Sequence, residues 1–206
     1  MEQKVFNKFN LYDQIGYIMV GATAQIIFCF NVKFFTNNAI PEINVSNFIV
    51  WFIIAYFFGH FIQSFSNVLS KIPLIKYLFK ENKTDFNSFE KEILLEAKKY
   101  FKMKTDDFSR IWNVCYQFCS TNDNTGQIQS FNSNYGLYRG WLVLFILNQI
   151  FLCIQIIKNY TVFTLLIFCV NLIVLFVFQN RMKRFWNYFR DKVINNFIIV
   201  LSKEKE

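Results

Sequence analysis

The sequence has few of the residues from which soluble catalytic sites are usually built. Histidine occurs once in 206 residues, as His60, and there are only two prolines and six glycines. With a single histidine, a histidine-based metal site or a Ser-His-Asp triad is very hard to assemble. The signatures of phosphate loops, dinucleotide turns, zinc proteases and serine hydrolases are absent from the sequence as well. We therefore expect no enzymatic activity, no cofactor, and no catalytic or metal-binding residues.

Charged side chains are scarce and unevenly placed. They make up 17% of the chain, and 54% of its residues are hydrophobic, whereas soluble domains have about 25% charged residues. Four apolar blocks, at about 15–32, 48–66, 141–157 and 160–178, lack proline, and His60 is their only His, Asp, Glu, Lys or Arg. As helices they reach roughly 25–29 Å, near the short end of what crosses a ~30 Å hydrocarbon core. The missing charged relay residues argue against ion-coupled transport.

The basic residues indicate how these blocks are oriented. Of the 22 Lys and Arg residues, two precede the first block, 11 lie between the second and third, and seven follow the fourth. The positive-inside rule then places both termini and the middle segment in the cytoplasm. We predict an all-α membrane protein with about four transmembrane helices and a small helical cytoplasmic insertion between helices two and three. Apolar sequence continues past the small residues 22–24, so we do not expect a cleaved signal peptide.

The expected organisation has four segments. They are an N-terminal pair of transmembrane helices (1–68), a cytoplasmic helical domain (69–139), a C-terminal transmembrane hairpin (140–179) and a basic amphipathic cytoplasmic tail (180–206). In the middle segment, Asn87 or Ser88 can cap a helix that has Glu90 in its first turn. A second helix is predicted from Thr105, and its apolar residues follow helical spacing on one face: Phe108, Ile111, Trp112, Cys115 and Cys119.

Uncharged polar residues recur inside the predicted spans. The candidates for a pore lining or for contacts between helices are Gln25, Asn148, Gln155 and Asn171. Asn148 and Gln155 are seven residues apart and so share a helix face. Such side chains avoid lipid, and they either hydrogen-bond across helices or face water.

Three further residues are candidates for a gate or an interface: His60, Gln63 and Arg139. His60 is the one titratable group at membrane depth, and such groups are functional candidates. It is either a pH-sensitive gate or a polar pin, or a neutral histidine hydrogen-bonded at a helix contact. Arg139 lies between Gly136 and Gly140, a spacing that permits close helix approach. Its expected partner is a lipid phosphate, or an acidic residue of the soluble domain or of a neighbouring subunit.

The segment after the fourth block interleaves basic and aromatic residues. Such a helix is expected to lie against anionic lipid at the membrane surface. The same side chains can contact RNA phosphates and stack on bases. The candidates for membrane-surface or nucleic-acid contact are Arg181, Lys183, Arg184, Trp186 and Arg190.

Two short segments of the chain are similar to segments of a known protein family. They are Gly59-His60-Phe61-Ile62-Gln63-Ser64 and Tyr135-Gly136-Leu137-Tyr138-Arg139-Gly140. With the length and the four-span layout, they resemble the small membrane accessory proteins encoded beside the RNA-guided RNA nuclease of type VI-B CRISPR systems. The resemblance implies a place in the bacterial inner membrane and a role in antiphage defence. It also implies pore formation in one branch of the family, with a divergent HEPN motif in which arginine precedes histidine. No arginine precedes His60, so we do not expect RNA cleavage.

The sequence therefore predicts one of two functions. The first is an accessory or effector protein that modulates RNA-targeting defence as a homo-oligomeric membrane pore. The second is a membrane-tethered module that recruits or restrains a cytoplasmic partner without forming a pore. The expected partners are the lipid bilayer, further copies of the chain and the RNA-guided nuclease, with RNA contact left open.

Overall fold

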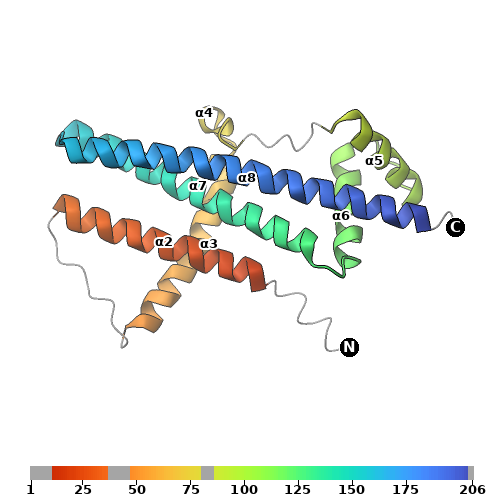
Figure 1. Ribbon diagram of the computed structural model, residues 1–206, viewed down its shortest axis with the longest axis horizontal. Coiled ribbons are helices and arrows are strands. Elements are labelled where there is room, and N and C mark those ends of the chain that lie inside the picture. Colours follow the sequence, from red (N-terminus) through yellow and green to blue (C-terminus); the bar gives the residue numbers. More distant parts are fainter. Residues whose placement is uncertain (1–10, 37–46, 80–85, 204–206) are drawn as a thin grey trace. The chain divides into compact units, whose positions relative to one another are not determined.

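The computed structural model describes residues 11–36, 47–79 and 86–203. Across these ranges the regular structure is entirely helical (Figure 1). The helices are α2 (Leu11–Thr36), α3 (Phe48–Leu69), α4 (Pro73–Lys76), α5 (Ser88–Tyr100), α6 (Phe108–Thr121), α7 (Gln127–Lys158) and α8 (Val162–Lys203). The expected all-α fold is confirmed for this part of the chain.

Four of these helices, α2, α3, α7 and α8, are long and apolar enough to cross a membrane. This agrees with the four predicted spans. However, α7 has 32 residues and α8 has 42, so at 1.5 Å per residue they extend about 48 Å and about 63 Å, well beyond a ~30 Å hydrocarbon core. No proline or glycine interrupts α8. The segment expected as a separate tail is therefore a continuation of the last span.

The chain divides into two compact units. The first unit contains residues 1–79 and 133–182, and the second contains 80–132 and 183–206. Helices α7 and α8 each contribute to both units. This grouping differs from the four expected segments, because the basic residues after 182 belong with the middle segment instead of standing alone.

In the first unit, α2 and α3 cross in close contact (Figure 1). A Cβ atom built on Gly21 would lie 1.6 Å from the Ala55 carbonyl oxygen, and one built on Gly59 would lie 1.9 Å from the Tyr17 carbonyl oxygen. Only a residue without a side chain fits at these two positions. Backbones approach in this way where small residues face each other across membrane helices.

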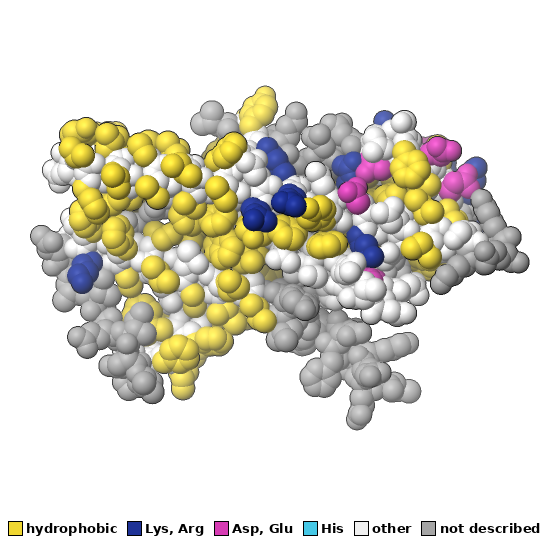
Figure 2. Space-filling model, in the orientation of Figure 1, with side chains coloured by type: hydrophobic (Ala, Val, Ile, Leu, Met, Phe, Trp, Pro, Cys, Tyr) yellow, Lys and Arg dark blue, Asp and Glu magenta, His cyan; other side chains and the backbone are white. Residues whose placement is uncertain are grey.

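The surface of the first unit is strongly apolar. Large hydrophobic side chains are exposed on all four long helices, among them Phe28, Phe57, Phe61, Ile157 and Phe176. On the face seen in Figure 2, the spans of this unit are covered by hydrophobic side chains, and the acidic side chains in view lie over the second unit. Apolar patches of this extent are typical of surfaces that contact lipid or protein rather than water.

The second unit packs α5 and α6 with the C-terminal part of α8. Its helices begin with side-chain caps: Asn87 and Glu90 form a reciprocal capping box, with N–H···O distances of 2.8 and 2.7 Å. Asp107 accepts a hydrogen bond from the Ser109 amide, so α6 begins at Phe108 and not at the predicted Thr105. The buried core includes Leu94, Ala97, Ile111, Trp112, Cys115, Cys119, Phe189, Val193 and Phe197.

Candidate functional site

Four amide side chains from three helices meet inside the first unit. Asn31 of α2 donates a hydrogen bond to the Asn148 Oδ1 atom of α7 at 2.9 Å, and Asn148 donates to the Asn171 Oδ1 atom of α8 at 2.8 Å. Asn171 donates in turn to the Phe145 carbonyl oxygen at 3.0 Å and to the Gln149 side chain. We call Asn31, Asn148, Gln149 and Asn171 the amide network. It joins α2, α7 and α8 through neutral polar groups.

Burial explains why these amides pair with one another. Asn171 is 3% exposed, and a buried amide without a partner would lose its hydrogen bonds to water without replacement. Hydrogen bonds between membrane helices each contribute about 0.6 kcal/mol on average and up to about 1.7 kcal/mol. The network is therefore a source of specific packing between the helices of one chain.

Two members of the amide network, Asn148 and Asn171, were predicted as candidates from the sequence, and Asn31 was not. Asn148 and Asn171 were expected to contact other helices or to line a pore, and the structure places them in contact. Asn31 was missed because it stands at the end of the first predicted block, beside the polar loop, whereas α2 continues to Thr36. A polar residue near the end of an apolar block is the signal in the sequence that could have identified Asn31 as a partner for Asn148.

Two glutamines bridge other pairs of helices in the same unit. Gln25 of α2 donates to the Trp51 carbonyl oxygen of α3 at 2.9 Å. Gln63 of α3 donates to the Gly136 carbonyl oxygen of α7 at 3.1 Å, and a Cβ built on Gly140 would lie 2.8 Å from its Oε1 atom. The glycine pair before the third apolar block therefore makes room for the Gln63 side chain.

His60 lies in the contact between α2 and α3. Its ring stacks on Tyr17 at a centroid distance of 3.9 Å and meets the edge of Tyr56 at 4.4 Å. The Tyr56 hydroxyl donates to the Gln14 side chain at 2.9 Å. The Nε2 atom of His60 is buried and has no hydrogen-bond partner within the described ranges. His60 is thus at a helix interface of its own chain, where aromatic rings rather than hydrogen bonds surround it.

Arg139 contacts the C-terminal end of α3. Its Nη2 atom donates to the Ser66 carbonyl oxygen at 3.3 Å and to the Ser70 hydroxyl at 3.2 Å, and its guanidinium carbon lies 5.9 Å from the centre of the Phe79 ring. A helix C-terminus carries partial negative charge and attracts a cation. The sequence suggested a lipid phosphate or a carboxylate as the partner of Arg139, and these contacts add the end of α3 to the groups that it meets.

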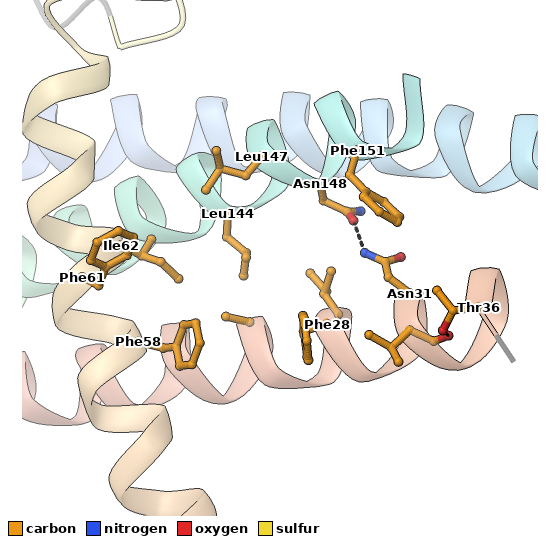
Figure 3. Close-up of a pocket in the computed structure, with 13 residues that line it drawn as sticks. Phe28, Asn31, Thr36, Phe58, Phe61, Ile62, Leu144, Leu147, Asn148 and Phe151 are labelled. Carbon is orange, nitrogen blue, oxygen red and sulfur yellow. Dashed lines mark hydrogen bonds between the residues drawn. The ribbon is translucent and has the colours of Figure 1, made fainter. Parts of the chain in front are cut away.

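An elongated groove of about 360 Å³ lies between α2, α3 and α7. Figure 3 shows Phe28 and Phe58 on one side, Leu144 and Leu147 on the other, and the Asn31–Asn148 hydrogen bond toward one end. Apart from this pair and Thr36, its lining is apolar. Because such a lining does not favour a column of water, the groove is not an aqueous path through one chain.

Gln155 differs from the other predicted polar residues. It is half-buried near the end of α7 and takes no part in the amide network. A glutamine at membrane depth needs a partner from water, lipid or another chain. Of the four residues named as pore-lining or helix-contact candidates, Gln155 is the one whose side chain makes no hydrogen bond to another helix among the described residues.

The basic-aromatic segment of α8 is split between surface and interior. Arg181 and Arg184 are exposed, and Lys183 is half-buried. Trp186, by contrast, is only 8% exposed, and the centre of its ring lies 5.5 Å from the centre of the Phe189 ring in the second unit. Trp186 therefore does not lie on the exposed face of α8 with Arg181 and Arg184, and part of its ring lines a pocket of this unit. The buried residues Met182, Trp186, Phe189, Val193 and Phe197 are spaced by three or four, a pattern that predicts a buried face.

Arg190 was also expected at the surface, and it forms a buried ion pair instead. Its guanidinium donates to both carboxylate oxygens of Glu90, with an Nε–Oε1 distance of 2.7 Å. The side chains of Arg190 and Glu90 are 12% and 5% exposed. The guanidinium also lies 5.5 Å from the centre of the Phe86 ring. Because Glu90 also closes the capping box of α5, this pair fixes the start of α5 to α8.

The described residues contain no group of three or more His, Cys, Asp or Glu side chains that could hold a metal ion. Cys115 and Cys119 face the core of the second unit, and the Cys119 thiol donates to the Val193 carbonyl oxygen at 3.5 Å. A hydrogen bond with Cys119 and burial both raise the pKa of the Cys115 thiol. Neither position has the exposed, electropositive surroundings of a reactive cysteine.

Comparison of the chain with known protein families, with curated proteins and with solved structures finds no match.

Proposed function

We propose that this chain is a membrane-tethered regulatory protein of bacterial RNA-targeting antiphage defence, held in the inner membrane by the first unit and acting through the second. The observation that carries the proposal is the amide network. Its polar side chains hydrogen-bond to one another within one chain, as expected for helices that serve as a stable anchor. The second unit is then the part that meets a partner, with both termini in the cytoplasm.

Three features support this function. Charge placement puts 20 of the 22 basic residues on the cytoplasmic side in this orientation. The exposed Arg181 and Arg184 follow the apolar part of α8, where they would meet anionic lipid head groups. The likeness of the segments around His60 and Arg139 to the CRISPR accessory proteins adds the class of partner, an RNA-guided RNA nuclease.

The proposal is tested by capture of the nuclease. The full chain, reconstituted in lipid nanodiscs, is incubated with the purified nuclease–guide RNA complex, and co-elution is measured by size-exclusion chromatography. Retention that is lost on deleting residues 88–121 while the chain remains membrane-inserted supports the tethered module. Absence of any complex with nuclease, guide RNA or both contradicts it.

The pore is the second candidate, and Gln155 is the observation that favours it. A half-buried glutamine outside the amide network could be satisfied by the same residue in a neighbouring copy. A pore requires several copies, because the groove within one chain is apolar. The oligomeric state in nanodiscs, measured by native mass spectrometry, decides this point. A monomer, or an oligomer that causes no ion leak in liposomes, removes the pore.

A further inference from the structure

The second unit contains a pocket of about 220 Å³ between α6, the start of α7 and α8. Four aromatic side chains line it: Trp112, Tyr116, Trp186 and Phe189. Phe189 is the centre of this group, since its ring lies 5.1 Å from Tyr116, 5.5 Å from Trp186 and 6.1 Å from Trp112. These contacts hold the rings in place and bury most of Trp112, Trp186 and Phe189, which are 7%, 8% and 3% exposed. The pocket therefore has a preformed aromatic lining in which the half-buried Tyr116 is the most accessible ring.

The remaining lining is polar but uncharged. It consists of Ser109 and Asn113 of α6 and Asn132 of α7. Asn113 is exposed and Asn132 is half-buried, so their carboxamides can meet a ligand from solvent. Each carboxamide offers a donor and an acceptor in one plane. No charged side chain is among the described residues of the lining.

This combination discriminates between classes of ligand. A cage for a quaternary ammonium group relies on aromatic faces around a cation, usually with a carboxylate nearby, and a phosphate site needs basic groups or free amides. Aromatic rings together with carboxamides suit a flat, neutral heterocycle that stacks and forms paired hydrogen bonds along one edge. Nucleobases are recognised by this pairing of aromatic and amide side chains.

Basic side chains lie one helical turn from the pocket. Arg110 precedes Asn113 by three residues on α6, and Lys183 precedes Trp186 by three residues on α8, so each is a neighbour on the helix surface. Arg110 is 76% exposed and its contact with Asp107 is long, at 3.6 Å. These cations are placed to meet a phosphate group attached to a ligand in the pocket.

We propose that this pocket binds a nucleobase. The ligand is either a free nucleotide or one base of a single-stranded nucleic acid, and both present the same ring to the pocket. Binding of such a ligand goes beyond the proposed function, because it needs neither the nuclease nor an oligomer. It gives the second unit a chemical signal to which it can respond.

The test uses the full chain in nanodiscs and follows tryptophan fluorescence. Two of the four tryptophans line the pocket, so a stacked base is expected to quench their emission. Adenosine, guanosine, cytidine and uridine monophosphates and a six-nucleotide RNA are titrated separately. Saturable quenching by at least one of them is the expected result. Saturation by a mononucleotide identifies a free nucleotide, and saturation by the RNA alone, weakened by salt, identifies single-stranded nucleic acid.

The control variants separate recognition from folding. The double substitution Asn113→Ala and Asn132→Ala is expected to weaken binding by about fivefold to about 100-fold, as for the loss of paired contacts to a base. Asn195→Ala, which changes an exposed asparagine elsewhere on α8, should leave affinity unchanged. Equal affinity in the double variant with unchanged helicity overturns the proposal. So does the absence of saturable binding by all five ligands, whether or not the nuclease is captured.

Discussion

The two units of this chain hold their helices together by different polar interactions. In the first unit, neutral amides join several helices, as in the amide network and in Gln25 and Gln63, and the Arg139 guanidinium donates to neutral oxygen atoms of α3 and of the residue after it. In the second unit, a charged pair between Glu90 and Arg190 joins α5 to α8. The difference matches the composition of the two units. A charge is costly inside helices that are apolar enough to cross a membrane, whereas a unit with many charged residues can bury an ion pair when both partners are fully hydrogen-bonded.

We expect the loss of one partner to destabilise the Glu90–Arg190 pair more than it destabilises the amide network. Glu90→Gln leaves the Arg190 guanidinium buried without its counter-charge, and breaking a buried pair in this way costs about 3–5 kcal/mol. We expect the second unit to unfold at much lower temperature, as followed by circular dichroism and limited proteolysis in detergent. Glu96→Gln serves as the control, because its contact with Lys99 is at the surface. Its effect should be within about 1 kcal/mol, and equal shifts in the two variants would show that the Glu90–Arg190 pair is unimportant.

The tight crossing of α2 and α3 provides the next largest effect. Gly59→Ala would bring a methyl group into the Tyr17 backbone, and overpacking of this kind costs about 1–3 kcal/mol. Gly16→Ala is the matched control, since nothing lies within 4 Å of a Cβ at that position. We expect it to be neutral or slightly stabilising, because alanine is the better helix former. Thermal unfolding in detergent measures both variants, and similar melting temperatures would contradict the close contact.

The amide network should show a smaller effect than the ion pair. Asn171→Leu removes three of its hydrogen bonds and leaves the partner groups unsatisfied, at an expected cost of about 1–3 kcal/mol. Gln155→Leu, on α7 but outside the network, should not destabilise the monomer. Melting temperatures of the two variants in detergent test this difference. A lower melting temperature for Gln155→Leu than for Asn171→Leu would mean that the Gln155 side chain stabilises the monomer, which contradicts this prediction.

The smallest effect concerns a surface carboxylate and depends on pH. Burial acts to raise the pKa of Asp123, but hydrogen bonds from Thr125 and Ile128 outweigh it, so the pKa lies below its ordinary value. A carboxyl group with a lowered folded pKa stabilises the protein above its unfolded pKa, near about 4, and this stability is lost as the pH falls through the folded value.

Asp123→Ala should therefore cost about 0.5–2 kcal/mol at pH 7, the usual effect of losing a carboxylate that binds the first amides of a helix. The difference from the unsubstituted chain should shrink below about pH 4. Melting curves at pH 7, 5 and 3 measure it. A difference that stays constant over this range would mean that the Asp123 charge has no part in stabilising the start of α7.

Local patterns in the sequence predicted a large part of this fold. The apolar blocks, a helix cap at Asn87 or Ser88 and the apolar face of α6 were predicted from spacing and residue type, since these features depend on neighbours within a few residues, and Asn87 is the cap. The predicted ends of helices were less accurate. Helix α8 continues through Lys203 because no proline or glycine stops it, and because Trp186, Phe189 and Phe197 bury their side chains in the second unit.

The site residues divide in the same way. His60, Gln63, Asn148 and Asn171 were recognised as unusual because they are polar residues in apolar helices. Their partners could not be assigned, since any of several polar groups could have satisfied them. Arg190 shows the opposite error. Its basic-aromatic neighbourhood suggested a surface role, and a partner 100 residues earlier, Glu90, placed it in the interior.

The sequence by itself determined that the chain is helical, that four of its segments suit a membrane, and that the apolar blocks of these segments carry almost no charge. Composition and periodicity are sufficient for these properties, because each depends on the free energy of placing a segment in lipid or water. The tertiary structure decided which polar groups meet. Asn31 and Asn148 are 117 residues apart, and only the packing of α2 against α7 brings their side chains within hydrogen-bonding distance.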